Sequence, residues 1–408
     1  MKREKTYQWV VVGLLWFVAL LNYMDRQMLA TMKPSMQVDI ADLQSATNFG
    51  YLMAIFLWIY GCMSPVSGII ADRFNRKWLI VSSLFIWSAV TFTMGYATSF
   101  NQLYILRAIM GISEALYIPA GLSLIADYHS SATRSLAVGI HMTGLYVGQA
   151  LGGFGATIAA TYSWHTTFHF FGFVGISYSL ILLLFLKEKK SYDGDDMLQS
   201  ERIPVTKTLS LLLSNISFWI ILLYFAIPSI PGWATKNWLP TLFASNLAIG
   251  MSKAGPISTI TIAVSSFIGV LFGGLLSDKW VQKNIRGRIY TSAIGLGLTI
   301  PSLLLIGFGH SLFHVVAAAF CFGFGYGMFD ANNMPILCQF VNNKSRATAY
   351  GLMNMTGVFA GAFITNVLGK STDAGNLGKG FAMLAVIVIV ALIIQLKFLR
   401  PEKNMQPD

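Results

Sequence analysis

The amino-acid sequence predicts an all-α membrane protein in which twelve membrane-spanning helices form two pseudo-symmetric bundles of six. Three observations lead to this fold class. The chain is 55% hydrophobic and 11% charged, with a mean hydropathy of +0.62, whereas soluble domains contain about 25% charged residues. Twelve apolar stretches are each long enough to cross a bilayer, which takes about 20 helical residues. The two halves of the chain also repeat each other's loop motifs.

The twelve expected spans follow one another with short connections, so almost no chain is left for a water-soluble domain. The first resembles a signal peptide in position, but it is too long, contains Asp25 and Arg26 and precedes no small-residue cleavage site. We therefore expect a retained helix. The spans are 8–31, 46–71, 78–97, 102–126, 135–160, 165–186, 213–237, 255–277, 289–309, 312–334, 347–368 and 379–398.

A polar segment separates the sixth span from the seventh. Residues 187–208 are too charged to cross a membrane and are rich in Lys, Asp and Ser. We therefore expect an N-terminal six-helix bundle over residues 1–186, a cytoplasmic linker over 187–208 and a C-terminal six-helix bundle over 209–408.

The net charge of +11 is explained by membrane topology. Most Lys and Arg residues fall in the loops on the same side as the N-terminus. Basic loops stay on the cytoplasmic side, so we expect a multi-pass protein of the inner (plasma) membrane with both termini in the cytoplasm. Nucleic-acid binding has no suitable fold in this chain. The opposite side holds only Lys33, Lys236, Lys253, Lys370 and Lys379.

The loops after the second and the eighth span repeat each other. Residues 68–77 read GIIADRFNRK and residues 274–283 read GLLSDKWVQK, so the glycine, aspartate, basic residue and final lysine recur at an offset of 206. A looser pair, residues 134–139 and 346–351, begins with Arg and ends with Gly in both halves. Duplicated six-helix halves place a binding site between them near the membrane midplane.

Four ionisable residues inside the expected spans predict a transport pathway. Asp25 and Arg26 lie in the first span, and Arg107 and Glu114 lie in the fourth. The latter two are seven residues apart, so they share one helix face. A charge at the bilayer centre costs about 3 kcal/mol on insertion scales and persists mainly where it faces a partner or a wet cavity.

The first repeated loop resembles the GxxxDRxxRK motif of the major facilitator superfamily, and the resemblance extends over essentially the whole chain. It implies two bundles that rock about a central cavity lined by segments one, four, seven and ten. It also implies that the repeated loops are a conformational latch rather than part of the substrate site. The latch residues would be Gly68, Asp72, Arg73, Arg76, Lys77, Asp278 and Lys279.

Two further motifs resemble the anion:cation symporter family, which moves sugar acids and other organic anions. Residues 22–26 (NYMDR) resemble its NYxDR stretch, and residues 107–115 (RAIMGISEA) resemble its RxxxGxxEA stretch. Residues 238–240 (WLP) and Asn354 are also similar to family positions. The same N-terminal motifs occur in Spinster-like lipid transporters, whereas Asn354 and the polar seventh segment favour the anion group.

This resemblance implies uptake of a sugar acid, such as a hexuronate, an aldonate or sialic acid, by proton-coupled symport. With both acids ionised, we expect Arg26 and Arg107 to be paired. Burial disfavours an ionised carboxyl group, so Asp25 or Glu114 would load a proton and free an arginine to hold a carboxylate in bidentate geometry. Sodium coupling, a permanent salt-bridge cluster, lipid transport and uncoupled diffusion are the alternatives. No HxxxD, HExxH or GxSxG motif supports an enzyme.

Other polar side chains in the expected cavity are candidates for holding sugar hydroxyl groups, although each is equally suited to bond a neighbouring helix. Lys236 is alternatively an interface residue that reaches the headgroups, and Asp330 would belong to a gate. The three cysteines lack CxxC spacing, so we expect no metal site and no cofactor, and we expect a monomer. The expected substrate-binding residues are Arg26, Arg107, Tyr23, Gln149, Tyr224, Lys236, Asn237 and Asn354.

Overall fold

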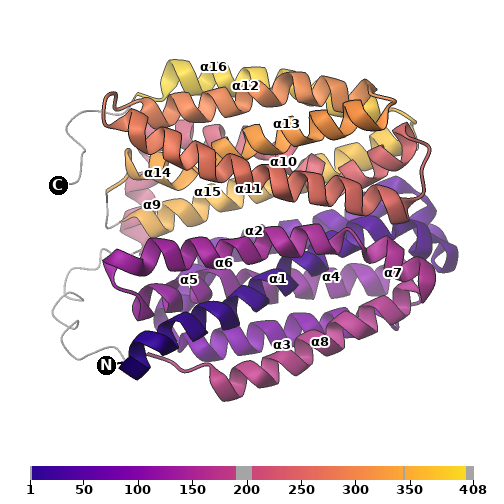
Figure 1. Ribbon diagram of the computed structural model, residues 1–408, viewed down its shortest axis with the longest axis horizontal. Helices are drawn as coiled ribbons and strands as arrows, with labels where there is room; N and C mark the ends of the chain where they lie inside the picture. The colour runs from indigo at the N-terminus through magenta and orange to yellow at the C-terminus, as the bar shows by residue number, and fades with distance from the viewer. Residues whose placement is uncertain (1, 190–204, 343–344, 401–408) are drawn as a thin grey trace.

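The computed structural model describes residues 2–189, 205–342 and 345–400, and within these ranges every regular element is a helix (Figure 1). The elements are α1 (Lys2–Asp39), η1 (Ala41–Gln44), α2 (Ala46–Arg73), α3 (Arg76–Met94), α4 (Phe100–Ala115), α5 (Tyr117–Tyr128), α6 (Ser131–Gly152), α7 (Gly155–Thr161), α8 (Trp164–Phe185), α9 (Val205–Leu213), α10 (Ile216–Asn246), α11 (Met251–Val281), α12 (Gly287–Phe308), α13 (Leu312–Asp330), α14 (Asn333–Cys338), α15 (Arg346–Asp373) and α16 (Leu377–Phe398).

The helices form two groups, α1 to α8 and α9 to α16, which lie one above the other in Figure 1. In the described residues, eleven segments are long and apolar enough to cross a membrane, and the twelfth expected span, 135–160, falls on α6 and α7. The all-α fold class is confirmed. Most of the expected linker 187–208 lies outside the described residues, so the domain boundaries remain a prediction.

Three of the expected spans, 102–126, 135–160 and 312–334, are each divided between two helices in the described residues, and backbone chemistry explains the first break. The span 102–126 is divided into α4 and α5 at Leu116, because Pro119 has no N–H group to bond the carbonyl of Ala115. The freed end of α4 is stabilised from α3, since the Ser83 hydroxyl donates to the carbonyl of Ser113 at 2.5 Å. Backbone groups inside a bilayer must be satisfied by protein in this way.

Proline also exposes a backbone carbonyl in α10, which retains three prolines inside one helix. Pro240 cannot donate to the carbonyl of Lys236, four residues earlier. That carbonyl instead accepts a hydrogen bond of 2.9 Å from Nε2 of Gln27 on α1. The proline therefore creates an attachment point between the two halves of the molecule.

Glycines allow neighbouring helices to approach closely, as expected where both partners are in lipid. A Cβ atom on Gly148 of α6 would overlap the backbone of Leu20 on α1. Gly153 and Gly255 bring the two halves together in the same way, because a Cβ on Gly255 would meet the carbonyl of Gly153. The glycine-rich stretch of α6 is thus a packing surface.

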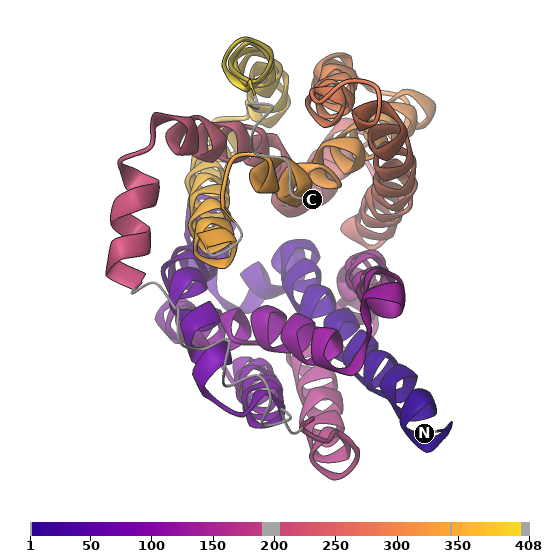
Figure 2. The same cartoon turned by 90° about the vertical axis from the view of Figure 1, so that its left-hand side faces the viewer.

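The two halves are joined at the end of the bundle opposite the termini, which lie together at the left of Figure 1 and face the viewer in Figure 2. The Asp373 carboxylate at the end of α15 caps the start of α2. It accepts from the Ser45 hydroxyl at 2.8 Å and from the N–H groups of Ala46 and Thr47 at 2.7 and 2.8 Å. An anion at a helix N-terminus is also favoured by the helix dipole.

We expect Asp373→Asn to shift the protein toward states that are open at this end. The loss of a charged cap costs about 1 kcal/mol, which changes a two-state population about fivefold. Spin labels on cysteines introduced at Asp42 and Asn376 would report the distance between α2 and α15. Asp39→Asn is the matched control, because the partners of the Asp39 carboxylate among the described residues, Trp164 and His165, belong to its own half. An unchanged distance distribution in Asp373→Asn would contradict the role of this cap.

Candidate functional site

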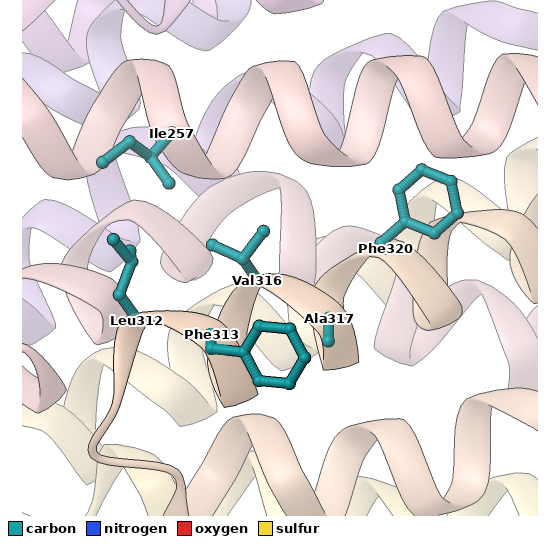
Figure 3. Close-up of a pocket in the computed structure, with 6 residues that line it drawn as sticks. All are labelled: Ile257, Leu312, Phe313, Val316, Ala317 and Phe320. Atoms are coloured by element: carbon teal, nitrogen blue, oxygen red, sulfur yellow. The ribbon is translucent and has the colours of Figure 1, made fainter.

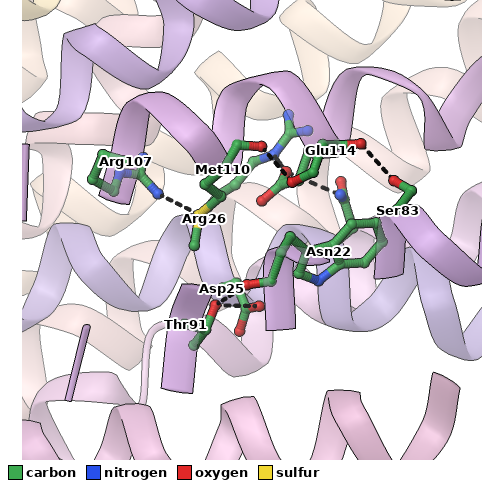
Figure 4. Close-up of polar contacts among 10 residues, drawn as sticks. Asn22, Asp25, Arg26, Ser83, Thr91, Arg107, Met110 and Glu114 are labelled. Atoms are coloured by element: carbon green, nitrogen blue, oxygen red, sulfur yellow. Dashed lines mark hydrogen bonds and ion pairs between the residues drawn. The ribbon is translucent and has the colours of Figure 1, made fainter. Parts of the chain in front are cut away.

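Four ionisable residues of the first half lie close together between α1 and α4, as Figure 4 shows. They are Asp25, Arg26, Arg107 and Glu114. The Nε atom of Arg26 lies 2.6 Å from Oε2 of Glu114. Nδ2 of Asn22 donates to the same oxygen at 2.9 Å, and Glu114 is completely buried. One carboxylate oxygen of Glu114 therefore accepts hydrogen bonds from two donors of α1, whereas the other oxygen, Oε1, has no hydrogen-bond partner in the described residues.

The position of Glu114 within its helix disfavours its negative charge. Glu114 is the penultimate residue of α4, which ends in the middle of the expected span. The C-terminal end of a helix carries a partial negative charge, so the ionised form of Glu114 depends on Arg26. A proton on Glu114 would release that arginine.

Asp25 is not paired with either arginine. Its Oδ2 atom accepts a hydrogen bond of 3.3 Å from the Thr91 hydroxyl of α3, and within the described ranges no Lys or Arg nitrogen lies within 4.0 Å of its carboxylate. The Oδ1 atom has no partner. The expectation that both arginines are paired with acids therefore fails at this residue.

Arg107 is the second departure from that expectation. It is 3% exposed and donates to the sulfur of Met110 at 3.1 Å, but its guanidinium forms no ion pair with any acid in the described part of the chain. Its Cζ atom stands 4.5 Å from the centre of the Phe56 ring. Arg26 approaches the same ring at 4.8 Å, so both cations contact one aromatic ring.

These contacts leave an unusual concentration of unsatisfied polar atoms in the membrane interior. Buried polar groups normally have partners, and each exception calls for an explanation. A buried charge without a counter-ion is more costly still. A bound anion would supply acceptors for the arginines, and a proton would satisfy a carboxylate. The atoms without partners are Oδ1 of Asn22, Oδ1 of Asp25, Nη2 of Arg26, Nε of Arg107 and Oε1 of Glu114.

Tyr23 lies where the two halves meet. Its ring centre is 5.2 Å from Cζ of Arg26 on its own helix and 5.6 Å from Nζ of Lys236 on α10. Gln149 is buried and lines, together with Lys236, a recess of about 10 Å³ between the halves, which is room for about one water molecule. Tyr23, Gln149 and Lys236 are therefore brought to one place.

Three other candidates make contacts of a structural kind. The Tyr224 hydroxyl is buried within the second half, where it bonds Ser292 at 3.0 Å and Asn333 at 3.2 Å. Asn237 donates to the hydroxyl of Thr365 on α15 at 2.8 Å. Asn354 joins the halves, because its amide donates to the Ser64 hydroxyl at 2.8 Å.

The latch motifs lie at the terminus end of the bundle. The side chains of Asp72 and Arg73 lie outside the described residues. Arg76 forms an ion pair with Asp127 at the end of α5, and the N–H group of Lys77 donates to Glu188 at 2.7 Å.

The remaining latch residues have few contacts. A Cβ atom on Gly68 would meet nothing within 4 Å. In the second half, Asp278 lies 3.4 Å from Arg288, and Lys279 is exposed.

The structure also assigns site roles to residues that sequence analysis missed. Asn22 is part of the NYMDR motif, so its position three residues before Asp25 was a usable signal. Thr91 and Phe56 gave no signal, because a threonine and a phenylalanine are ordinary in a membrane span. Only the contacts of Thr91 with Asp25 and of Phe56 with the two arginines reveal them.

An apolar pocket of about 630 Å³ lies away from these residues, between α11 and α13 (Figure 3). It contains no charged side chain, and Phe313 on its rim is 79% exposed. We do not assign it to the same site. Its lining residues are Ile257, Leu312, Phe313, Val316, Ala317 and Phe320.

Comparison with known proteins shows the family to which the chain belongs. Residues 15–366 match the Major Facilitator Superfamily. The chain is 27% identical to a D-galactonate transporter of Escherichia coli O6:H1, over 96% of this chain and 95% of that one. It is 23% identical to a hexuronate transporter of Bacillus subtilis (96% and 94%), and 24% identical to a sphingosine-1-phosphate transporter of Xenopus tropicalis (96% and 82%).

Among solved structures, a bacterial homolog of the human lysosomal transporter Spinster, in an inward-facing and unoccupied conformation, superimposes with a TM-score of 0.82. The two chains are 19% identical over 98% of this chain and 99% of that one. At this identity the similarity establishes the fold alone.

Proposed function

Because this chain belongs to the major facilitator superfamily, we propose that it is a secondary transporter that takes up an organic anion together with a proton. The anion class is sugar acids, such as hexuronates, aldonates or sialic acid. The observation that carries this proposal is the buried Arg107, which lies beside the Arg26–Glu114 pair and forms no ion pair with an acid of the described residues. The galactonate and hexuronate transporters among its relatives support the same substrate class.

The charges of the cluster explain why proton and anion would bind together. Asp25, Arg26, Arg107 and Glu114 sum to zero when all are ionised. A carboxylate that entered alone would leave a net negative charge in a buried site, which is costly. A proton taken up with it restores neutrality, so each ligand favours the other, as symport requires.

Binding would begin at Arg107 and recruit Arg26. Protonation of Glu114 removes the partner of Arg26, and both guanidinium groups could then donate to one carboxylate. The Phe56 ring, which both guanidinium groups contact, would hold their orientation through cation–π contacts. The arginines belong to the first half, and Lys236, a candidate contact for the same ligand, belongs to the second. Separation of the halves would therefore break contacts with the ligand and release it.

Lipid transport is the second candidate function. It is favoured by the apolar pocket between α11 and α13 and by the sphingosine-1-phosphate transporter among the relatives. The polar cluster between α1 and α4 favours a small anion instead. Uncoupled diffusion of the same anion is the remaining alternative.

Counterflow in proteoliposomes tests these functions against one another. Radiolabelled sugar acids and lysolipids would be presented to the purified protein with and without an inward proton gradient. We expect uptake of at least one sugar acid, accelerated by the gradient. Lysolipid transport without sugar-acid uptake would favour the lipid function, and sugar-acid uptake without gradient dependence would favour uncoupled diffusion.

We further propose a monomer in the plasma membrane with both termini in the cytoplasm. After the native cysteines Cys62, Cys321 and Cys338 are replaced, an impermeant maleimide should label Ser252→Cys but not Ser191→Cys in intact cells. Ser252 begins α11 at the end opposite the termini, and Ser191 belongs to the linker outside the described residues. The reverse labelling pattern would overturn this orientation.

A further inference from the structure

Lys236 is a cation of the second half that no acid neutralises by contact. Its Nζ atom lies 4.9 Å from the ring centre of Trp233 on α10 and 5.6 Å from that of Tyr23 on α1. In the described part of the chain, no carboxylate lies within 4.0 Å of it. Its ammonium group contacts a ring of the opposite half, which favours a role between the halves over that of a lysine reaching the headgroups.

The surroundings of Lys236 are polar and come from both halves. The small recess beside it is lined by hydroxyl and amide side chains together with Leu239, Pro240 and Ile262. The hydrogen bond from Gln27 to the Lys236 carbonyl fixes the backbone on its rim. A cation next to several donors and acceptors is suited to an oxygen-rich anion. The polar residues of the recess are Gln27, Gln149, Thr235, Ser258 and Thr259.

The Asp330 carboxylate offsets part of the positive charge of Lys236 but does not form an ion pair with it. The Asp330 carboxylate is within electrostatic range of Lys236 but beyond ion-pair distance, and it accepts a hydrogen bond of 3.1 Å from Asn333. It is also exposed. The positive charge of Lys236 is therefore partly offset and is still available to a ligand.

We propose that Lys236 forms a second anion subsite and that the transporter selects sugar acids with a carboxylate at each end. One carboxylate binds Arg107 and Arg26, and the other binds Lys236. The two poles belong to opposite halves and flank one aromatic ring, Tyr23, which offers a flat surface to the carbon chain between them. This inference rests on the proposed function, because it assumes that the arginine cluster binds a carboxylate.

Binding of matched acids to the purified protein tests this inference. Each pair consists of an aldonate and the aldarate with the same carbon skeleton, which differ only in the second carboxylate. We expect the wild-type protein to bind the diacid about tenfold more tightly, as for one added charge-assisted contact. Lys236→Met should abolish this preference, so that the two acids of each pair bind with similar affinity, because the contact that only the diacid makes is lost.

Two further variants separate a charge effect from a structural one. Lys236→Arg should keep the diacid preference, and Asp330→Asn should strengthen diacid binding, because it removes the competing carboxylate. A purely structural lysine would not produce opposite changes in Lys236→Met and Asp330→Asn. Lys253→Met is the control, since Lys253 is an exposed lysine at the start of α11.

The outcomes distinguish this inference from the function on which it rests. A monoacid that binds as tightly as the diacid, or Lys236→Met weakening both acids equally, would overturn the second subsite. Proton-driven uptake of the monoacid would then still support the proposed function. Binding of neither acid would overturn both.

Discussion

Glu114→Gln should abolish uphill uptake of a sugar acid driven by a proton gradient, while substrate binding and exchange persist. Glutamine keeps the size of the side chain and an oxygen that can accept from Arg26 and Asn22, but it cannot release a proton. It imitates the loaded state, in which this carboxyl group is protonated. Accumulation against a gradient and exchange at equal concentrations can be measured in the same proteoliposomes.

The pH dependence of binding gives an independent measure. Wild-type affinity should weaken as the pH rises, because the proton that accompanies the anion is lost. That dependence should flatten in Glu114→Gln. Undiminished proton-driven accumulation in this variant would move the coupling role to Asp25, and the same result with Asp25→Asn would leave the proposed mechanism without a proton carrier.

Arg107→Lys should lose most of the affinity for the anion, even though it retains the positive charge. Lysine cannot reproduce the planar pair of donors that binds a carboxylate, and a charged hydrogen bond contributes about 1.5–3 kcal/mol. We therefore expect a loss of about ten- to a hundredfold in equilibrium binding.

The matched control for this variant is Arg286→Lys. Arg286 is also an arginine over an aromatic ring, at 5.0 Å from Tyr290, and it donates to the carbonyl of Leu396 at the terminus end. Its replacement should leave affinity unchanged. Wild-type affinity for the anion in both Arg107→Ala and Arg26→Ala would contradict the assignment of the anion site.

The spans and the membership of the charged cluster could be predicted from sequence because the bilayer imposes simple requirements. Long apolar runs must be helices, and an ionisable residue within one must face protein or water. These rules place Asp25 and Arg107 in the interior. Two of the interrupted spans break near Pro119 and, between α6 and α7, after Gly152. The sequence does not reveal these breaks, because the chain on both sides of each is apolar.

The pairing within the cluster could not be predicted in the same way. Whether Arg26 or Arg107 meets Glu114 depends on how α1 and α4 are rotated and shifted against each other. That arrangement comes from side-chain packing among four helices, including Phe56 of α2 and Thr91 of α3. Side-chain packing also decides the orientation of Tyr224, whose hydroxyl group bonds partners within its own half instead of facing a substrate site.

The capping of α2 by Asp373 implies a two-position switch. The helices α2 and α15 lie antiparallel: Gly50 meets the backbone near Thr365, and Gly61 meets Phe359. Each helix carries an aspartate at or beside its last residue, Asp72 in α2 and Asp373 in α15, at the end where its partner begins. The latch role expected of Asp72 would then alternate with the Asp373 cap: we expect a tilt of the two helices that brings one acid to the start of its partner helix to move the other acid away.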